Sequence, residues 1–218
     1  MTLVSVIIPT HNRWEMLSES LASVRQQTFG DYEIIVVSNG ENAESRKLSR
    51  AAATRYGAHY FEIEEGNVSV ARNFGTKLAH GKWIAFLDDD DIWLPQKLER
   101  QIAEAERTGA DMIVCANVEL LPDGSERLPR EHYPDRWPHL KAICHQIWIA
   151  LPSSTMISKA ALNAAGGFDP EQKANEDCDL WRRISWRYKI HRMPEVLSKW
   201  RRGARKKGAS RVRQTAGW

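Results

Sequence analysis

Cysteine is scarce in this chain of 218 residues, which contains only Cys115, Cys144 and Cys178. An odd number of widely spaced cysteines predicts neither a disulfide framework nor a zinc site. No segment approaches the ~20 consecutive apolar residues that a membrane-spanning helix needs. The N-terminus opens on a strand-like run and lacks the basic leader of a signal peptide. We therefore expect a cytoplasmic protein in a reducing environment, with a single main core.

Acidic residues are absent from the C-terminal end, since none follows Glu195. Eight basic residues lie beyond that point, so the rest of the chain holds 23 basic against 28 acidic residues, although the whole chain carries +3. Such a basic tail is typical of a solvated end. It is also compatible with a phosphorylated ligand, with nucleic acid, or with peripheral contact to anionic lipid at the inner membrane face. Because the basic tail is the only feature that favours nucleic acid, we do not expect nucleic acid as a partner.

The first half of the chain alternates between strand and helix patterns. Apolar runs predict strands over residues 3–8, 32–37, 59–63, 83–87 and 111–118. Apolar residues at helical spacing predict helices over residues 14–27, 43–56, 69–80 and 95–108. This alternation favours an α/β fold in which helices flank a mostly parallel central sheet.

The second half follows a different pattern. Residues 119–146 have no clear period and predict an irregular connection that is long enough to be functional. A strand is expected over 150–157, followed by helices over 159–165 and 176–188 and an extended segment over 189–200. Ser158 is the expected N-cap of the first of these helices, and Gly166 and Gly167 are expected to end it.

Polar segments follow four of the predicted strands. These segments are residues 9–13, 38–40, 64–67 and 88–91. In an open parallel sheet, ligands bind beyond the carboxyl ends of the strands. We therefore expect these segments to line one crevice.

The most informative segment is an apolar strand that runs directly into Asp88, Asp89, Asp90 and Asp91. Adjacent carboxylates repel, and burying them without partners is costly. A divalent cation explains such a cluster, and oxygen ligands suit Mg²⁺ or Mn²⁺. The alternative is an acidic turn that caps the helix beginning near Pro95.

Five segments in order resemble glycosyltransferase family 2. They are residues 5–13, 66–75, 81–91, 166–169 and 176–181. The resemblance implies a GT-A fold and an inverting, metal-dependent transfer of a sugar, of the hexosyltransferase type, from a nucleotide-diphosphate donor to an acceptor hydroxyl. It implies a nucleotide-sugar-binding half over 1–118, an acceptor-binding half of the same domain over 119–200, and a basic tail over 201–218. A glycan or lipid-linked acceptor, as in polysaccharide biosynthesis, would fit.

By similarity to the family's DXD motif, Asp90 is the direct ligand of Mn²⁺ or Mg²⁺. Asp89 would hold the donor's ribose or assist the metal, and Asp88 is the family's alternative first acid, so two registers stay open. The resemblance implies donor contacts from Pro9, Thr10, Asn12, Arg13, Ser38, Asn39, Gly66, Arg72, Asp88 and Asp89. Asn12 could instead cap the helix over 14–27. Arg72 could instead be a surface arginine paired with Glu64, Glu65 or the aspartates.

Asp177 is the candidate catalytic base, because inversion needs a carboxylate on the acceptor side, within reach of the attacking hydroxyl. Glu176 and Asp179 lie beside it, but residues at i and i+2 of a helix point in different directions. Only one of the three acids should therefore face the donor. The alternative is an acidic first turn that the helix dipole favours.

Two features depart from the family's pattern. Ser38 and Asn39 stand where the family usually carries acids that bind uracil, which weakens the case for a uridine donor. No histidine follows the last strand, so Arg201, Arg202 or a later lysine would contact the diphosphate. These departures leave open a non-catalytic relative that binds a nucleotide-sugar or a glycan. A nucleotidyltransferase is disfavoured, because no basic glycine-rich loop follows the first strand.

Overall fold

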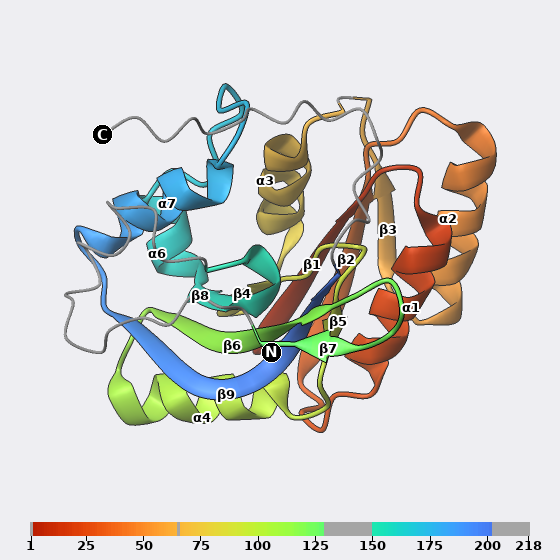
Figure 1. Ribbon diagram of the computed structural model, residues 1–218. Helices are drawn as coiled ribbons and strands as arrows, with labels where there is room; N and C mark the ends of the chain where they lie inside the picture. Colours follow the sequence, from red (N-terminus) through yellow and green to blue (C-terminus); the bar gives the residue numbers. More distant parts are fainter. Residues whose placement is uncertain (1, 65, 129–149, 202–218) are drawn as a thin grey trace, which may run out of the picture.

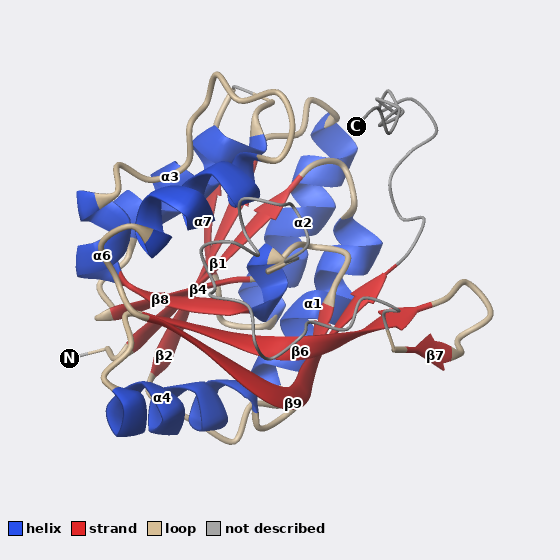
Figure 2. Ribbon diagram, turned by 60° about the vertical axis from the view of Figure 1, so that its left-hand side comes forward, coloured by secondary structure: helices blue, strands red, loops and turns tan. Residues whose placement is uncertain are grey.

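The computed structural model describes residues 2–64, 66–128 and 150–201, which form one sheet with helices on both faces (Figures 1 and 2). The strands are β1 (Val4–Thr10), β2 (Tyr32–Ser38), β3 (His59–Glu62), β4 (Trp83–Phe86), β5 (Ile92–Trp93), β6 (Met112–Leu120), β7 (Glu126–Arg127), β8 (Thr155–Ser158) and β9 (Ile190–Arg201). The helices are α1 (Trp14–Arg25), α2 (Ala43–Arg55), α3 (Val68–Leu78), α4 (Lys97–Thr108), the 3₁₀ turn η1 (Pro152–Ser154), α6 (Lys159–Ala164) and α7 (Glu176–Ser185).

The sheet is mixed and mostly parallel, which confirms the predicted α/β class. Its strand order is β3-β2-β1-β4-β8-β6-β9-β5, and β7 pairs with β6. The first four strands in this order run parallel to one another. β8 runs antiparallel to both β4 and β6, whereas β6 and β9 are parallel. The carboxyl ends of β1, β2, β3 and β4 therefore meet at one edge, as the crevice prediction requires.

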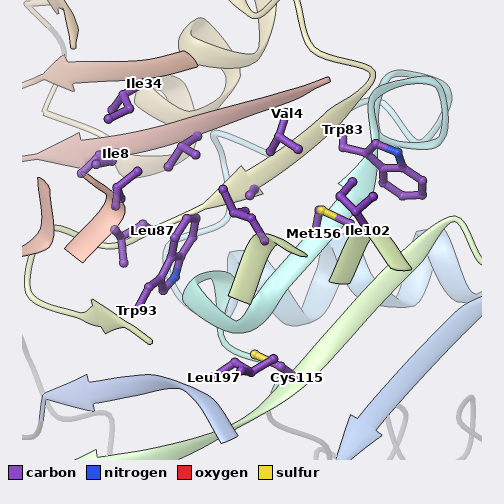
Figure 3. Close-up of a cluster of buried hydrophobic side chains, with 14 of the residues drawn as sticks. Val4, Ile8, Ile34, Trp83, Leu87, Trp93, Ile102, Cys115, Met156 and Leu197 are labelled. Atoms are coloured by element: carbon purple, nitrogen blue, oxygen red, sulfur yellow. The ribbon is translucent and has the colours of Figure 1, made fainter. Parts of the chain in front are cut away.

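Two hydrophobic layers cover the two faces of the sheet. Alternate residues of β1 contribute to the two layers, because successive side chains of a strand point to opposite faces of the sheet. Val4, Val6 and Ile8 pack with apolar residues of α1, α2 and α4, in the cluster drawn in Figure 3. Ile7 packs on the other face with apolar residues of α3, α6 and α7. The helix that carries Asp177 is thus fixed to the face of the sheet that it shares with α3 and α6.

Several predicted boundaries need correction. The strand expected over 150–157 is wrong in its first part, because Pro152 begins the 3₁₀ turn η1 and only Thr155 to Ser158 form β8. Local hydrogen bonds favour this turn, since Ser154 Oγ donates to the Leu151 carbonyl and Thr155 Oγ1 to the Pro152 carbonyl. The two-residue strand β5 was not predicted, and α4 begins at Lys97 rather than at residue 95.

Other predictions agree with the structure. Ser158 caps α6 by accepting a hydrogen bond from the Ala161 amide, and Gly166 and Gly167 end that helix with positive φ angles. The irregular connection expected over 119–146 is wrong in its first part, because Glu119 and Leu120 complete β6 and pair with β7. Residues 129–149 lie outside the described ranges. None of the helices in the described part of the chain combines the length and apolar character needed to cross a bilayer.

Candidate active site

The four aspartates lie in the turn between β4 and β5, at the carboxyl end of β4. A backbone hydrogen bond of 3.0 Å from the Asp91 amide to the Asp88 carbonyl closes this turn. Asp89 and Asp91 are buried, and Asp88 and Asp90 are partly exposed. Because four carboxylates in one turn repel one another, their partners decide how each is held.

Arg13 neutralises the two middle aspartates. Its Nε donates a hydrogen bond to Asp89 Oδ2 at 3.2 Å, and its Nη2 lies 2.5 Å from Asp89 Oδ1 as an ion-pair contact. Its Nη1 donates to Asp90 Oδ2 at 2.7 Å. Arg13 stands at the N-cap of α1, just after β1. The loop after β1 and the loop after β4 therefore form one site.

Arg72 connects the acid run to the helix of the candidate base. It lies in α3 with 3% of its surface exposed. Its Nη2 donates to Asp88 Oδ1 at 2.7 Å and its Nη1 donates to Glu176 Oε1 at 3.0 Å. Burial lowers the pKa of Arg72, but the charges of Asp88 and Glu176 raise it above its ordinary value. The alternative for Arg72 is therefore wrong about a surface position, because the guanidinium is buried, although the expected pairing with one of the aspartates is confirmed.

Asp91 is held by hydrogen bonds rather than by an arginine. Ser153 Oγ donates to Asp91 Oδ2 at 2.5 Å, and the Arg201 amide donates to Asp91 Oδ1 at 3.1 Å. Within the described residues Asp91 takes part in no ion pair. Burial raises its pKa well above the ordinary value, and the charges of Asp88 and Asp90 raise it further.

The acid run has the donor set of a divalent cation site. One carboxylate oxygen from each of Asp88, Asp90 and Asp91 lies within 4.8 Å of the others. Three hard oxygens at this spacing suit Mg²⁺ or Mn²⁺. Burial also raises the pKa of Asp90, and it raises that of Asp89 to about 7 against the opposing charge of Arg13. A cation would stabilise the ionised acids, so these residues fit the metal that the sequence predicts.

The three acids at the start of α7 face three different partners. Glu176 pairs with Arg72, Asp177 Oδ1 accepts the Cys178 amide at 2.8 Å, and Asp179 pairs with Arg183 at 2.7 Å. Burial raises the pKa of Asp177, and the neighbouring Glu176 charge raises it further. The expectation that these acids point in different directions is confirmed, and within the described residues no cation pairs with the carboxylate of Asp177.

The loops that follow β1 and β2 contact each other. The Asn39 amide donates to the Thr10 carbonyl at 3.1 Å, directly beyond the pairing of β1 with β2. Asn12 has φ of 55° and its Oδ1 accepts the Asn42 amide at 3.1 Å, so it ties the loops together. The alternative in which Asn12 caps α1 is wrong, because the residue at the N-cap is Arg13.

The remaining predicted donor residues have mixed positions. Pro9 and Ser38 are buried at strand ends, whereas Gly66 is exposed in the loop before α3. The side chain of Arg201 turns to Glu19, with Nη2 2.6 Å from Oε2, while its backbone amide bonds Asp91. Arg202 lies outside the described residues.

The loop between α6 and α7 is fixed to α3. Asn73 Oδ1 accepts the Phe168 amide at 2.9 Å, and Asn73 Nδ2 donates to the Phe168 carbonyl at 2.7 Å. Asn67 Nδ2 donates to the Pro170 carbonyl at 2.8 Å. Gly167 permits this contact, because a Cβ at that position would lie 2.6 Å from Asn73 Oδ1. The loop that precedes Asp177 is therefore anchored to the helix that carries Arg72.

A mixed α/β sheet with an acid run at a strand end is the architecture of the GT-A fold. The model of Glycosyl transferase family 2 matches residues 5–165, and the chain belongs to this family. An uncharacterized glycosyltransferase of Rickettsia prowazekii is 32% identical over 210 residues, covering 90% of this chain and 63% of the relative. The chain spans 28% to 63% of the length of five such curated relatives from Rickettsia.

One similar protein has a specific name. The UDP-Glc:alpha-D-GlcNAc-diphosphoundecaprenol beta-1,3-glucosyltransferase WfgD of Escherichia coli is 38% identical over 124 residues, covering 56% of this chain and 48% of that protein. Among solved structures, S. aureus TarS 1-349 with UDP-GlcNAc superposes with a TM-score of 0.77 at 19% identity, covering 92% of this chain and 58% of that one. The mannosyltransferase PcManGT of Pyrobaculum calidifontis, solved with GDP-Man and Mn²⁺, superposes with a TM-score of 0.69 at 18% identity. The match covers 94% of this chain and 58% of that one. These structures confirm the predicted GT-A fold.

Sequence reasoning missed three features of this site. Asp91 was seen as part of the acid run but was not assigned a role, although its oxygen lies in the candidate metal cluster. Glu176 was not recognised as the partner of Arg72, because the two residues lie 104 positions apart. Ser153 was read as part of a strand, and no local pattern marks a hydroxyl that will meet a distant carboxylate.

Proposed function

We propose that this chain is the catalytic domain of an inverting, metal-dependent glycosyltransferase that moves a sugar from a nucleoside-diphosphate donor to an acceptor hydroxyl. The observation that carries the proposal is the buried bridge through Arg72, which contacts Asp88 on one side and Glu176 on the other. Because Glu176 precedes Asp177, the bridge brings the acid run and the candidate base into one site. The charge of Asp88 also acts on the Asp177 carboxyl.

The donor lies along the carboxyl ends of β1, β2 and β4 in this proposal. Thr10, Ser38 and Asn39 contribute the buried polar groups of the first two loops. Asp88, Asp90 and Asp91 would hold Mn²⁺ or Mg²⁺, which when bound offsets the negative charge developing on the leaving diphosphate. Arg13 pairs with Asp90 of this set and with the adjacent Asp89, and it adds positive charge on the phosphate side of the donor.

Asp177 serves as the general base. The acceptor oxygen forms a bond to the anomeric carbon on the face opposite the diphosphate, the bond from that carbon to the diphosphate oxygen breaks, and the acceptor proton passes to Asp177. Burial raises the pKa of Asp177, which makes it a stronger base than an exposed aspartate. Arg72 fixes the first turn of α7 through Glu176 and so limits where Asp177 can lie.

The donor and acceptor classes follow from the similar proteins. TarS was solved with UDP-GlcNAc and PcManGT with GDP-Man, so both bases are candidates here. Ser38 supplies a neutral hydroxyl at the base end, which permits a base other than uracil. The name of WfgD describes a diphosphoundecaprenol-linked acceptor, and we propose a lipid-linked glycan of this kind. We keep the division into a donor half over 1–118 and an acceptor half over 119–200, and a peripheral membrane location, as predictions.

The decisive experiment compares Asp177→Asn with Asp179→Asn. The two variants change neighbouring acids of the same helix turn, but Asp179 pairs with Arg183, whereas Arg72 pairs with Glu176. Donor consumption is measured with UDP- and GDP-sugars in Mn²⁺, with a diphosphoprenol-linked sugar as acceptor. We expect Asp177→Asn to keep donor binding and lose transfer by at least ~100-fold, while Asp179→Asn stays close to the unmodified protein. Near-normal transfer by Asp177→Asn would overturn the assignment.

A second function, nucleotide-sugar or glycan binding without transfer, is favoured by the neutral Ser38. It would show itself as donor binding in Mn²⁺ with no consumption of any donor in the panel, either by transfer or by hydrolysis.

A further inference from the structure

Ser153 lies under the acid run and contacts two of its members. It is the middle residue of η1 and has 1% of its surface exposed. Its Oγ donates to Asp91 Oδ2 at 2.5 Å and accepts the backbone amide of Asp88 at 3.0 Å. A serine hydroxyl has one proton to donate, and here that proton is donated to the Asp91 carboxylate, while a lone pair of the oxygen accepts the backbone N–H of Asp88.

These two contacts span the candidate metal cluster. Asp88 is the first and Asp91 the last of its three acids, and each supplies an oxygen to the set within 4.8 Å. Asp88 and Asp90 are also held by arginines, whereas Asp91 depends on Ser153 and on the Arg201 amide. Removing the Ser153 hydroxyl would leave one oxygen of a buried carboxylate without its hydrogen bond, which is costly in a site of this kind.

Ser153 is itself held rigidly from the core side. Trp93 Nε1 donates to the Ser153 carbonyl at 2.8 Å, and Trp93 follows the acid turn in β5. Figure 3 shows Trp93 and Leu87, the residues that flank the turn, within the hydrophobic cluster. The Lys97 ammonium lies 4.1 Å from the Trp93 ring centre, which fixes the indole further. The hydroxyl therefore has a set position from which it can orient the acids.

We propose that Ser153 is a positioning residue of the metal site, which sets the Asp91 carboxylate and the Asp88 backbone at the separation that a divalent cation needs. This inference rests on the proposed function. Partners that orient ligating carboxylates typically change metal affinity by about 10–100-fold when they are removed.

The test measures Mn²⁺ affinity directly, by the loss of the electron paramagnetic resonance signal of free Mn²⁺ on titration with protein and UDP or GDP. Ser153→Ala is compared with Ser154→Ala. Ser154 is equally buried, but its hydroxyl donates to the carbonyl of Leu151, the residue before η1, and hydrogen-bonds no aspartate. Unfolding curves of both variants report any general loss of stability.

We expect Ser153→Ala to weaken Mn²⁺ binding by about 10–100-fold and Ser154→Ala to leave it within about twofold. Ser153→Thr keeps the hydroxyl, so its Mn²⁺ affinity should stay closer to that of the unmodified protein than the affinity of Ser153→Ala does. If Ser153→Ala does not fold, Ser153→Thr replaces it in the test. Weak Mn²⁺ binding by a folded Ser153→Thr variant then contradicts the proposal. Unchanged Mn²⁺ affinity in Ser153→Ala, or an equal loss in Ser154→Ala, overturns the positioning role. If the unmodified chain binds no Mn²⁺ with either nucleotide, the proposed function itself fails, and this inference fails with it.

Discussion

Replacing Arg72 by methionine tests the bridge on which the site depends. Methionine keeps most of the apolar length of the side chain but removes its charge, so Asp88 and Glu176 lose bonds of 2.7 Å and 3.0 Å. The ring of Phe168, 5.0 Å from the guanidinium, loses its cation as well. Breaking a fully buried pair costs ~3–5 kcal/mol.

The two acids reduce this cost because they can regain water. Their side chains are 30% and 21% exposed, so the carboxylates left behind are not fully buried. We therefore expect Arg72→Met to lower the free energy of unfolding by about 3 kcal/mol. For a chain of this size the fall in Tm is roughly 6–12 °C. Urea unfolding followed by circular dichroism gives the free energy, and scanning calorimetry gives Tm.

Arg50→Met is a matched control. Arg50 also contacts a carboxylate at 3.0 Å, that of Glu62, and an aromatic ring at 5.2 Å, that of Tyr60, but its side chain is 63% exposed. Exposed ion pairs contribute about 0–1 kcal/mol, so this variant should stay close to the unmodified protein. Equal losses in the two variants, or a loss below about 0.5 kcal/mol in Arg72→Met, would refute the reasoning.

Three further predictions test other parts of the structure. Burial lowers the pKa of Lys97 to about 8, below its ordinary value. The unfolded chain therefore binds more protons than the folded chain between about pH 8 and 10, so the free energy of unfolding should rise over this range by about 3 kcal/mol relative to Lys97→Met. Parallel curves of unfolding free energy against pH for the two proteins would contradict this. Gly167→Ala combines a φ of 72° with a clash against Asn73 and should cost about 2–4 kcal/mol in urea unfolding, whereas Gly57→Ala, with φ of 64° and nothing within 4 Å, should cost about 1 kcal/mol. Because burial raises the pKa of Asp177, kcat should fall on the acid side with an apparent pKa above the ~3.9 of a free aspartate, and a pH-independent kcat down to about pH 4 would argue against its role as base.

The sequence predicted that the polar segments converge at one edge of the sheet, because each of these segments follows a local strand pattern. An apolar strand followed by Asp88 places the acids at a strand end, and parallel strands carry Thr10 and Ser38 to the same edge. The prediction that these segments converge follows from topology alone, and the bonds from Arg13 to Asp89 and Asp90 agree with it.

The contacts that tune the site could not be predicted in the same way. Arg72 and Glu176 meet because α3 and α7 pack on one face of the sheet, and no local signal encodes that meeting. Ser153 was misread because apolar residues lie on both sides of it, Leu151 before it and Met156 and Ile157 after it, as in a strand. Pro152 and the hydroxyl groups of Ser154 and Thr155 favour a 3₁₀ turn instead. Long-range partners of this kind emerge only when the elements are assembled.

Mn²⁺-dependent nucleotide binding tests the central claim most directly. Calorimetric titration of UDP and GDP is run in Mn²⁺ and in EDTA, with the unmodified chain, with Asp90→Ala, and with Asp123→Ala as a control from the exposed turn before β7. We expect at least one of the two nucleotides to bind more tightly in Mn²⁺ than in EDTA. Asp90→Ala should abolish this difference in affinity, and Asp123→Ala should retain it. Equal affinity in Mn²⁺ and EDTA for both nucleotides, or an undiminished Mn²⁺ effect in Asp90→Ala, would contradict the central claim.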